Sequence, residues 1–259
     1  MAGFWACSPA VAEPALQVRG LARRFGGVAA VDAVELDLLP GEVHALIGPN
    51  GAGKTTLVNL ITGELRPDRG RVILAGQDVT GLAVERRRHL GLARSFQITS
   101  VFPSFSALDN VAMAVQALDG HSFRFLADAG ADSRLAGSAR EALAEVGLAD
   151  AATTPAGELA HGERRQLEMA MAMVGRPRVL LLDEPMAGMS PEESRRMVEL
   201  LERLRGRYSI LLVEHDMDAV FRLADRISVL VYGRVIATGD PAAIRANAEV
   251  RGAYLGEDG

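Results

Sequence analysis

The sequence predicts an α/β protein with a mostly parallel central sheet, an N-terminal antiparallel β subdomain and an inserted α-helical subdomain. Residues 43–47, 179–182 and 210–213 form short, continuous apolar runs, which are typical of strands buried on both faces. Helix-favouring stretches separate these runs, as connections between parallel strands require. Further strand patterns lie close to the first run, which favours a second, smaller sheet.

Each element follows from its local pattern. Alternating or clustered apolar residues, in one case after the turn-like stretch 67–70, predict antiparallel strands at residues 16–21, 34–38 and 72–75. Helical spacing with many Ala, Leu, Glu and Met residues predicts helices at residues 107–117, 138–146 and 163–174. We therefore expect an inserted helical subdomain that spans approximately residues 92–176.

Residues 15–256 are expected to form one domain, preceded by a tail, residues 1–14, that ends near Pro14. The tail contains Phe4, Trp5 and Cys7, but it has no basic segment and its apolar run is short, so a secretory signal is not predicted.

The composition excludes several classes of protein. A chain of 259 residues with 49% hydrophobic and 24% charged residues has the balance of a globular protein. No stretch approaches the roughly 20 apolar residues that cross a bilayer. The net charge of -5 argues against nucleic acid as a partner, because such domains carry a basic excess. The single cysteine cannot form an internal disulfide.

A glycine-rich loop follows the first apolar run. Its sequence, GPNGAGKTT, matches GxxxxGK[ST], in which backbone amides surround nucleotide phosphates, so the chain is predicted to have a P-loop NTPase core. Lys54 supplies a charge to the β- and γ-phosphates, and the Thr55 hydroxyl is placed for Mg²⁺. The nucleotide-binding candidates in this loop are Gly48, Pro49, Asn50, Gly51, Ala52, Gly53, Lys54, Thr55 and Thr56.

Two adjacent carboxylates follow the second apolar run. Asp183 and Glu184 come directly after residues 179–182, and carboxylates after such a buried strand need a functional reason. With a phosphate loop elsewhere in the chain, we expect Asp183 to help hold Mg²⁺ and Glu184 to polarise the water that attacks the γ-phosphate.

Five motifs in order resemble those of ATP-binding cassette (ABC) ATPases, over approximately residues 16–256. Besides the phosphate loop, they are RRFGG, ARSFQ, LAHGERRQLEMAMAM before RPRVLLLDEP, and VEHD. The resemblance implies the ABC ATPase fold. It also implies that Phe25 stacks on adenine, that Gln97 senses the γ-phosphate and Mg²⁺, and that His215 contacts the γ-phosphate.

The resemblance also implies a head-to-tail pair of cassettes, in which the signature segment of one faces the ATP of the other. This segment consists of Leu159, Ala160, His161, Gly162 and Glu163. A helix that begins near Glu163 would direct its amides at the γ-phosphate. The chain departs from the family pattern in having Ala160 for serine, His161 for glycine, Glu163 for glutamine, and Ser190 after the carboxylate pair for aspartate.

The segments LAHGERR, AGMSP and ARSFQ and the ending VRGAYLGED together resemble the branched-chain amino acid group of importers, specifically the subunit that retains VEHD. That resemblance implies an ATP-hydrolysing subunit at the cytoplasmic face of the inner (plasma) membrane, with ATP and Mg²⁺. It implies three kinds of partner: a second ATPase subunit, identical or different; transmembrane permease subunits; and a periplasmic or surface solute-binding protein. Coupling to the permease is expected through Gln97 and residues 98–110, with apolar contacts from Phe102, Pro103, Phe105 and Leu108.

Other interpretations stay open from the sequence alone. They are a urea or amide importer ATPase, a lipid-export ATPase, a soluble ABC ATPase acting on ribosomes or DNA, and a small-molecule kinase with the same loop. Two further groups of residues are expected to have structural and not catalytic roles. The cluster of residues 86–89 is expected to be a solvated face or hinge, and Met169, Met171 and Met173 to be packing residues of a helix.

Overall fold

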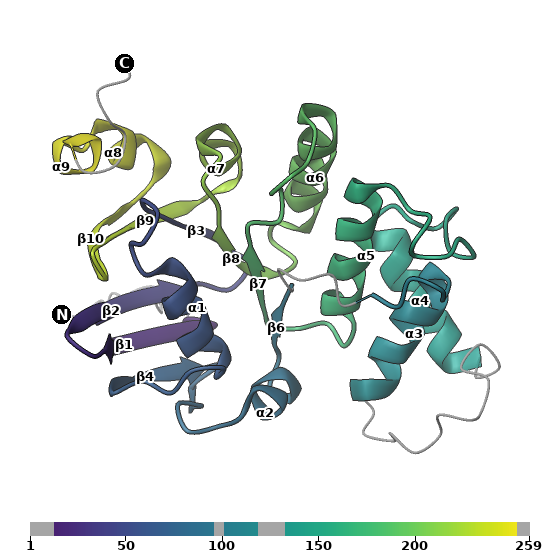
Figure 1. Ribbon diagram of the computed structural model, residues 1–259, viewed down its shortest axis with the longest axis horizontal. Coiled ribbons are helices and arrows are strands. Elements are labelled where there is room, and N and C mark those ends of the chain that lie inside the picture. Colours follow the sequence, from purple (N-terminus) through teal and green to yellow (C-terminus); the bar gives the residue numbers. More distant parts are fainter. Residues whose placement is uncertain (1–12, 96–100, 119–132, 253–259) are drawn as a thin grey trace, which may run out of the picture.

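The computed structural model describes residues 13–95, 101–118 and 133–252, and it contains two sheets (Figure 1). The smaller sheet is antiparallel with the strand order β2-β1-β4-β5. Its strands are β1 (Leu16–Phe25), β2 (Val28–Leu38), β4 (Arg69–Leu74) and β5 (Gln77–Asp78). β1 and β2 form a long hairpin in which Phe25 pairs with Val28 and Leu16 with Leu38.

The larger sheet has the strand order β10-β9-β3-β8-β7-β6, and all its neighbours are parallel except the β9–β10 hairpin. Its strands are β3 (Val43–Ile47), β6 (Leu92–Arg94), β7 (Val179–Asp183), β8 (Ser209–Val213), β9 (Arg226–Val231) and β10 (Arg234–Gly239). Every residue of β3, β7 and β8 is buried. The predicted α/β fold with an antiparallel subdomain and a mostly parallel sheet is therefore confirmed.

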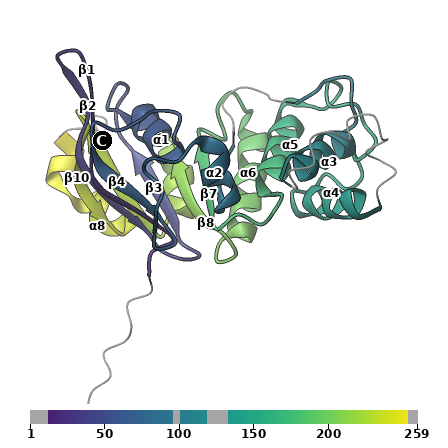
Figure 2. The same cartoon turned by 90° about the horizontal axis from the view of Figure 1, so that it is seen from below.

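Helices lie on both faces of the larger sheet and in a separate group at one end of the molecule. They are α1 (Lys54–Thr62), α2 (Val84–His89), α3 (Ala107–Leu118), α4 (Ser133–Glu145), α5 (His161–Met173), α6 (Pro191–Leu204), α7 (Met217–Leu223), α8 (Pro241–Ala246) and α9 (Ala248–Val250). α1 is sandwiched between the two sheets, and its Leu57, Leu60 and Ile61 share one apolar core with both. Figure 2 shows α3, α4 and α5 together at the far end of the molecule from the antiparallel sheet.

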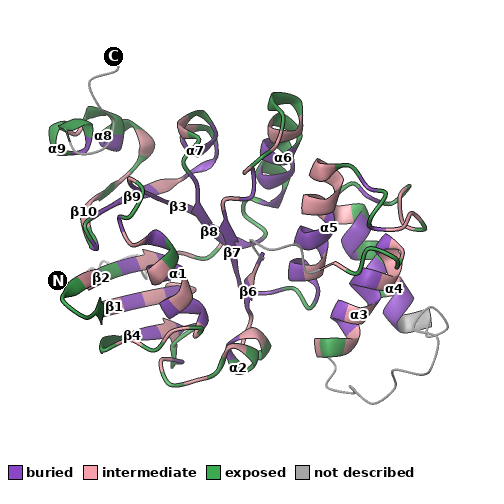
Figure 3. Cartoon of the chain, in the orientation of Figure 1, coloured by how far each residue is buried: buried purple, intermediate pink, exposed green. Residues whose placement is uncertain are grey.

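Burial follows this layering. The strands at the centre of the larger sheet are buried along their length, whereas α6 and α8 each bury one side and expose the other (Figure 3). Within the described residues, no helix combines the length and apolar character needed to cross a membrane.

The boundaries of several elements differ from the sequence expectation. β1 and β2 extend to residues 25 and 28, because the strands continue to a turn at Gly26 and Gly27 beyond the apolar pattern. α5 begins at His161, two residues before the expected start at Glu163, since Ala160 has extended backbone and serves as the N-cap. Met169 and Met173 are buried on this helix, as a packing role predicts.

The expectation of a solvated face at residues 86–89 is wrong for Arg87. This side chain is only 1% exposed. Its guanidinium donates to the carbonyls of Leu60, Ile61, Thr80 and Leu82 at 2.6 to 3.1 Å. Leu60 and Ile61 lie in the last turn of α1, where carbonyls have no partner within the helix. Arg87 thus supplies both donors and a positive charge to the end of the helix where the dipole favours a cation.

Candidate nucleotide-binding site

Three parallel strands carry the predicted site residues to one edge of the larger sheet. β8 lies between β3 and β7, with Leu46 and Asp183 in register with Val213. The loops that follow these strands hold the phosphate loop, the carboxylate pair and VEHD. Because parallel strands end at the same edge, sequence segments more than 100 residues apart meet there, which is where α/β proteins bind ligands.

The phosphate loop is held against the backbone of β2. Gly53 has φ +105°, and a Cβ at this position would lie 2.1 Å from the Ala30 carbonyl oxygen. The Ala52 carbonyl accepts a hydrogen bond from the Gly233 amide at 2.8 Å, which ties the loop to the β9–β10 turn. α1 begins at Lys54 and has no acidic residue in its first turn, so its N-terminal amides are open to an anion.

Lys54 is folded over its own loop. Its Nζ donates to the carbonyls of Gly48 at 2.6 Å and Pro49 at 3.1 Å. Burial lowers the pKa of the ammonium, and the nearby carboxylates of Glu184 and Asp183 oppose that shift. The side chain is therefore a buried cation held near two carboxylates, with Thr55 exposed and Thr56 half-buried beside it.

Asp183 and Glu184 point into this edge from the end of β7. Asp183 is 4% exposed, and its Oδ2 accepts a hydrogen bond from Arg94 at 2.8 Å. Glu184 adopts φ +50°, an uncommon backbone conformation for a residue with a Cβ, and its amide donates to the Val213 carbonyl at 2.8 Å. Its Oε1 lies 4.0 Å from His215 Nδ1, so the predicted carboxylate and histidine are brought together.

Glu214, which was not among the predicted site residues, contacts the segments that carry Glu184 and His215. Its carboxylate is 1% exposed and accepts the amides of Met186, His215 and Asp216 at 2.9 to 3.3 Å. One side chain therefore fixes both the loop after Glu184 and the turn that carries His215. The sequence signal was the acidic residue in VEHD. Two of its partners follow it directly, and the third, Met186, lies 28 positions away in the loop after β7.

Arg94 is a second residue that the sequence did not reveal. Its guanidinium donates to Asn59 of α1 and to Glu64, in addition to Asp183, each at 2.8 Å. It lies at the end of β6, and its side chain is 11% exposed. This arginine joins the helix after the phosphate loop to the carboxylate at the end of β7.

The signature segment lies at the start of α5. Glu163 Oε2 accepts the Ala160 amide at 2.9 Å, and His161 Nε2 lies 3.4 Å from the Ala187 carbonyl. The Gly162 amide donates to Glu193 of α6 at 2.9 Å. Leu159 is buried in the core next to these contacts.

Phe25 lies at the tip of the β1–β2 hairpin, 47% exposed, with the Arg23 guanidinium 5.2 Å from its ring centre. Its pairing partner Val28 lies on β2 two residues before Ala30, the residue whose carbonyl closely approaches Gly53 of the phosphate loop. Gln97 lies outside the described residues.

The mostly parallel sheet, the phosphate loop and the acidic end of β7 together define a P-loop nucleotide-binding ATPase. Two family models match the chain: "ABC transporter" over residues 31–187 and "Branched-chain amino acid ATP-binding cassette transporter" over residues 234–259. The chain belongs to the ABC transporter family, in which it is an ATP-binding and ATP-hydrolysing cassette.

Relatives match over nearly the whole length. The chain is 40% identical to the high-affinity branched-chain amino acid transport ATP-binding protein LivG of Escherichia coli, with 95% of this chain and 100% of that protein covered. It is equally identical to BraF of Pseudomonas aeruginosa, which carries the same description, with the same coverage. The structure of the ADP conformation of MJ1267, an ATP-binding cassette of an ABC transporter, superposes with a TM-score of 0.84 at 27% identity, covering 95% of this chain and 100% of that one.

Proposed function

We propose that this chain is the ATP-hydrolysing subunit of an importer for branched-chain amino acids or a related small polar solute. The observation that carries the proposal is its 40% identity to LivG and BraF along their full lengths. The match of residues 234–259 to a model specific to branched-chain amino acid cassettes supports it independently of the phosphate loop.

The site residues have the following proposed roles. Lys54 and the loop amides bind the β- and γ-phosphates, and the exposed face of Phe25 stacks on adenine. Glu184 accepts a proton from water as the water oxygen bonds to the γ-phosphorus and the bond to the departing ADP breaks. His215, 4.0 Å from Glu184, holds the γ-phosphate by a hydrogen bond. Gln97 is proposed to sense the same phosphate.

The residues present fit a magnesium ion bound together with nucleotide. Asp183 and Thr55 supply oxygen atoms, the ligands that Mg²⁺ prefers, and Gln97 would add a third. In the part of the chain that the structure describes, no group of three or more His, Cys, Asp or Glu side chains could hold a metal alone. The ion would therefore require the phosphate oxygens of ATP, and its chemistry would be to neutralise their charge.

The site is proposed to be completed by a second cassette, either the same chain or a different one. Figure 1 places α1 and α5 on opposite sides of strands β6 and β7, so α1 and the signature segment of one copy stand apart. A head-to-tail pair would place Leu159, Ala160, His161, Gly162 and Glu163 of one copy opposite Lys54 of the other. ATP would then lie in the interface.

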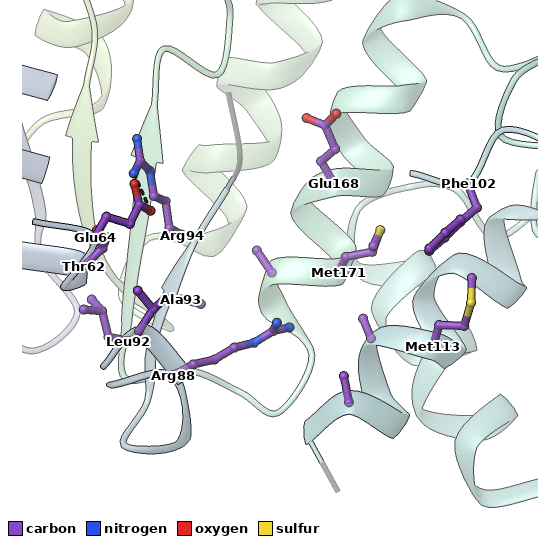
Figure 4. Close-up of a pocket in the computed structure, with 14 residues that line it drawn as sticks. Thr62, Glu64, Arg88, Leu92, Ala93, Arg94, Phe102, Met113, Glu168 and Met171 are labelled. Carbon is purple, nitrogen blue, oxygen red and sulfur yellow. Dashed lines mark hydrogen bonds and ion pairs between the residues drawn. The ribbon is translucent and has the colours of Figure 1, made fainter. Parts of the chain in front are cut away.

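A groove between the core and the helical end is the proposed contact for the permease. It is a cavity of about 300 Å³ lined by apolar side chains on both sides, among them Leu92, Met113 and Met171, and by charged ones such as Arg88 and Glu168 (Figure 4). Phe102 lines it, is 50% exposed and packs edge-on against Phe105. Phe102 and Phe105 belong to the predicted coupling segment, 98–110, whose first part, residues 98–100, lies outside the described residues.

The remaining parts of the proposal concern location and domain organisation. A chain that binds permease subunits would lie at the cytoplasmic face of the inner membrane, and a solute-binding protein would deliver the amino acid from outside. Residues 92–176 are proposed to form the inserted helical subdomain within one domain, residues 15–256, and residues 1–14 to be a dispensable tail.

Hydrolysis by the purified chain tests the enzymatic part of the proposal. We expect Glu184→Gln to keep ATP binding but to lose hydrolysis by a factor on the order of 10²–10⁴, because only the proton acceptor is removed. Turnover near that of the wild type would exclude Glu184 from this role. Glu192→Gln, a change on the surface of α6, is the matched control.

A further inference from the structure

The carboxylate of Glu193 joins the beginnings of two helices. Its Oε1 accepts the Gly162 amide at 2.9 Å, in the first turn of α5. Its Oε2 accepts the amide and the hydroxyl of Ser190, the N-cap of α6, at 2.9 and 2.8 Å. The signature segment is thus bonded to the loop after the carboxylate pair through one side chain.

The contact with Gly162 is closely packed. A Cβ on residue 162 would lie 3.0 Å from Glu193 Oε1 and 3.1 Å from its Cγ, so only glycine allows the carboxylate this position without a shift. Hydrogen bonds from Ser190, and then from Gly162, lower the pKa of Glu193 to about 2. The group is therefore an anion at physiological pH, seated at a helix N-terminus that favours negative charge.

The amide that Glu193 occupies belongs to the surface that the proposed function directs at a phosphate. Residue 160 is alanine and offers no hydroxyl, so the segment must bind the phosphate with other donors. The Ala160 amide is already bonded to Glu163 and the Gly162 amide to Glu193. A phosphate oxygen and a carboxylate oxygen cannot both take the Gly162 proton at close range, since two anions would then repel each other.

We propose that Glu193 is a gate on the signature segment: its carboxylate occupies the Gly162 amide in the separate cassette and must withdraw before the γ-phosphate of a partner's ATP binds there. The inference rests on the proposed head-to-tail pairing. It gives a physical role to Ser190, whose hydroxyl and amide hold the gate in place. Movement of the Ser190 loop at the interface would release Gly162.

ATP-dependent dimerisation of the purified chain tests the gate. Glu184→Gln serves as the parent, because slow hydrolysis preserves ATP, and sedimentation velocity measures the dimer as Mg²⁺ and ATP are titrated. Adding Glu193→Ala frees the amide, and adding Glu193→Gln removes the charge while keeping an acceptor for Ser190. We expect both to lower the ATP concentration at half-dimerisation, by about five- to tenfold for Glu193→Ala, since an anion competing at a helix N-terminus is removed.

The control is Glu192→Gln, which removes a neighbouring exposed charge that pairs with Arg196. It should leave the midpoint unchanged. Hydrogen exchange of the nucleotide-free protein supplies a second readout: the Gly162 amide should exchange faster in Glu193→Ala than in the parent or the control. A midpoint that is unchanged or raised in both Glu193 variants would overturn the gate. Equal exchange rates of the Gly162 amide in Glu193→Ala and in the parent would overturn it too. Failure of the proposed function would be recognised separately, as absence of ATP hydrolysis by the wild type.

Discussion

Arg87 is predicted to be a main support of the helix that follows the phosphate loop. The perturbation is Arg87→Met, which keeps much of the apolar volume and removes every guanidinium donor. Four carbonyls, those of Leu60, Ile61, Thr80 and Leu82, would lose their donor. At about 1 kcal/mol for each, the loss is about 4 kcal/mol, and relief of the desolvation of the buried charge reduces it to about 2–4 kcal/mol.

Urea unfolding followed by circular dichroism measures this loss as a fall in the free energy of unfolding. Arg86→Met is the matched control, because Arg86 is an exposed neighbour on the same helix, and its effect should stay within about 0.5 kcal/mol. Arg87→Lys keeps the charge and fewer donors, so it should fall between the two. A loss below about 1 kcal/mol for Arg87→Met, or equal losses for both methionine variants, would show that the Arg87 guanidinium does not support α1.

Three further predictions concern single contacts. Arg94→Met should weaken Mn²⁺ binding to the ATP-bound protein, because Asp183 loses the partner that orients it. Electron paramagnetic resonance measures this binding, and an Mn²⁺ affinity equal to that of the wild type would contradict the prediction. Burial lowers the pKa of His44 to about 4, so its contribution to stability is complete above about pH 6.5. The free energy of unfolding should therefore fall by about 2 kcal/mol between pH 7 and pH 5. A fall of the same size in the free energy of unfolding of His44→Gln would contradict this. Gly53→Ala should weaken ATP binding at least about tenfold in a fluorescence titration, because its Cβ would meet the Ala30 carbonyl. Gly51→Ala is the control: its Cβ would have open space around it, so it should weaken ATP binding less. Equal effects of the two changes would contradict a role for the close approach to Ala30.

The sequence predicted the parts of the site that are local. The phosphate loop, Asp183 and Glu184 each follow a buried strand, so a short window contains both the residue and its structural context. The same holds for the central strands, whose apolar runs have one explanation in a parallel sheet. His215 and Glu184 could be named but not paired, because their 4.0 Å separation depends on the register of two strands.

The residues that the sequence did not reveal act through distant partners. Arg94 reaches Asp183, 89 positions away, and Glu193 reaches Gly162, 31 positions away. Arg87 looked like one of several exposed basic residues, since nothing in its neighbourhood distinguishes it from Arg86 and Arg88. Its burial follows from the position of α2 against the end of α1, which is a tertiary contact with no local pattern.

ATP hydrolysis by this chain is proposed to drive amino-acid uptake. Its most direct test is the uptake of radiolabelled leucine by cells that lack the gene for this chain and are supplied with the wild type or with Glu184→Gln. We expect uptake to be restored by the wild type and not by Glu184→Gln, although both proteins bind ATP. Equal restoration by the two proteins, or no restoration by either, would contradict it.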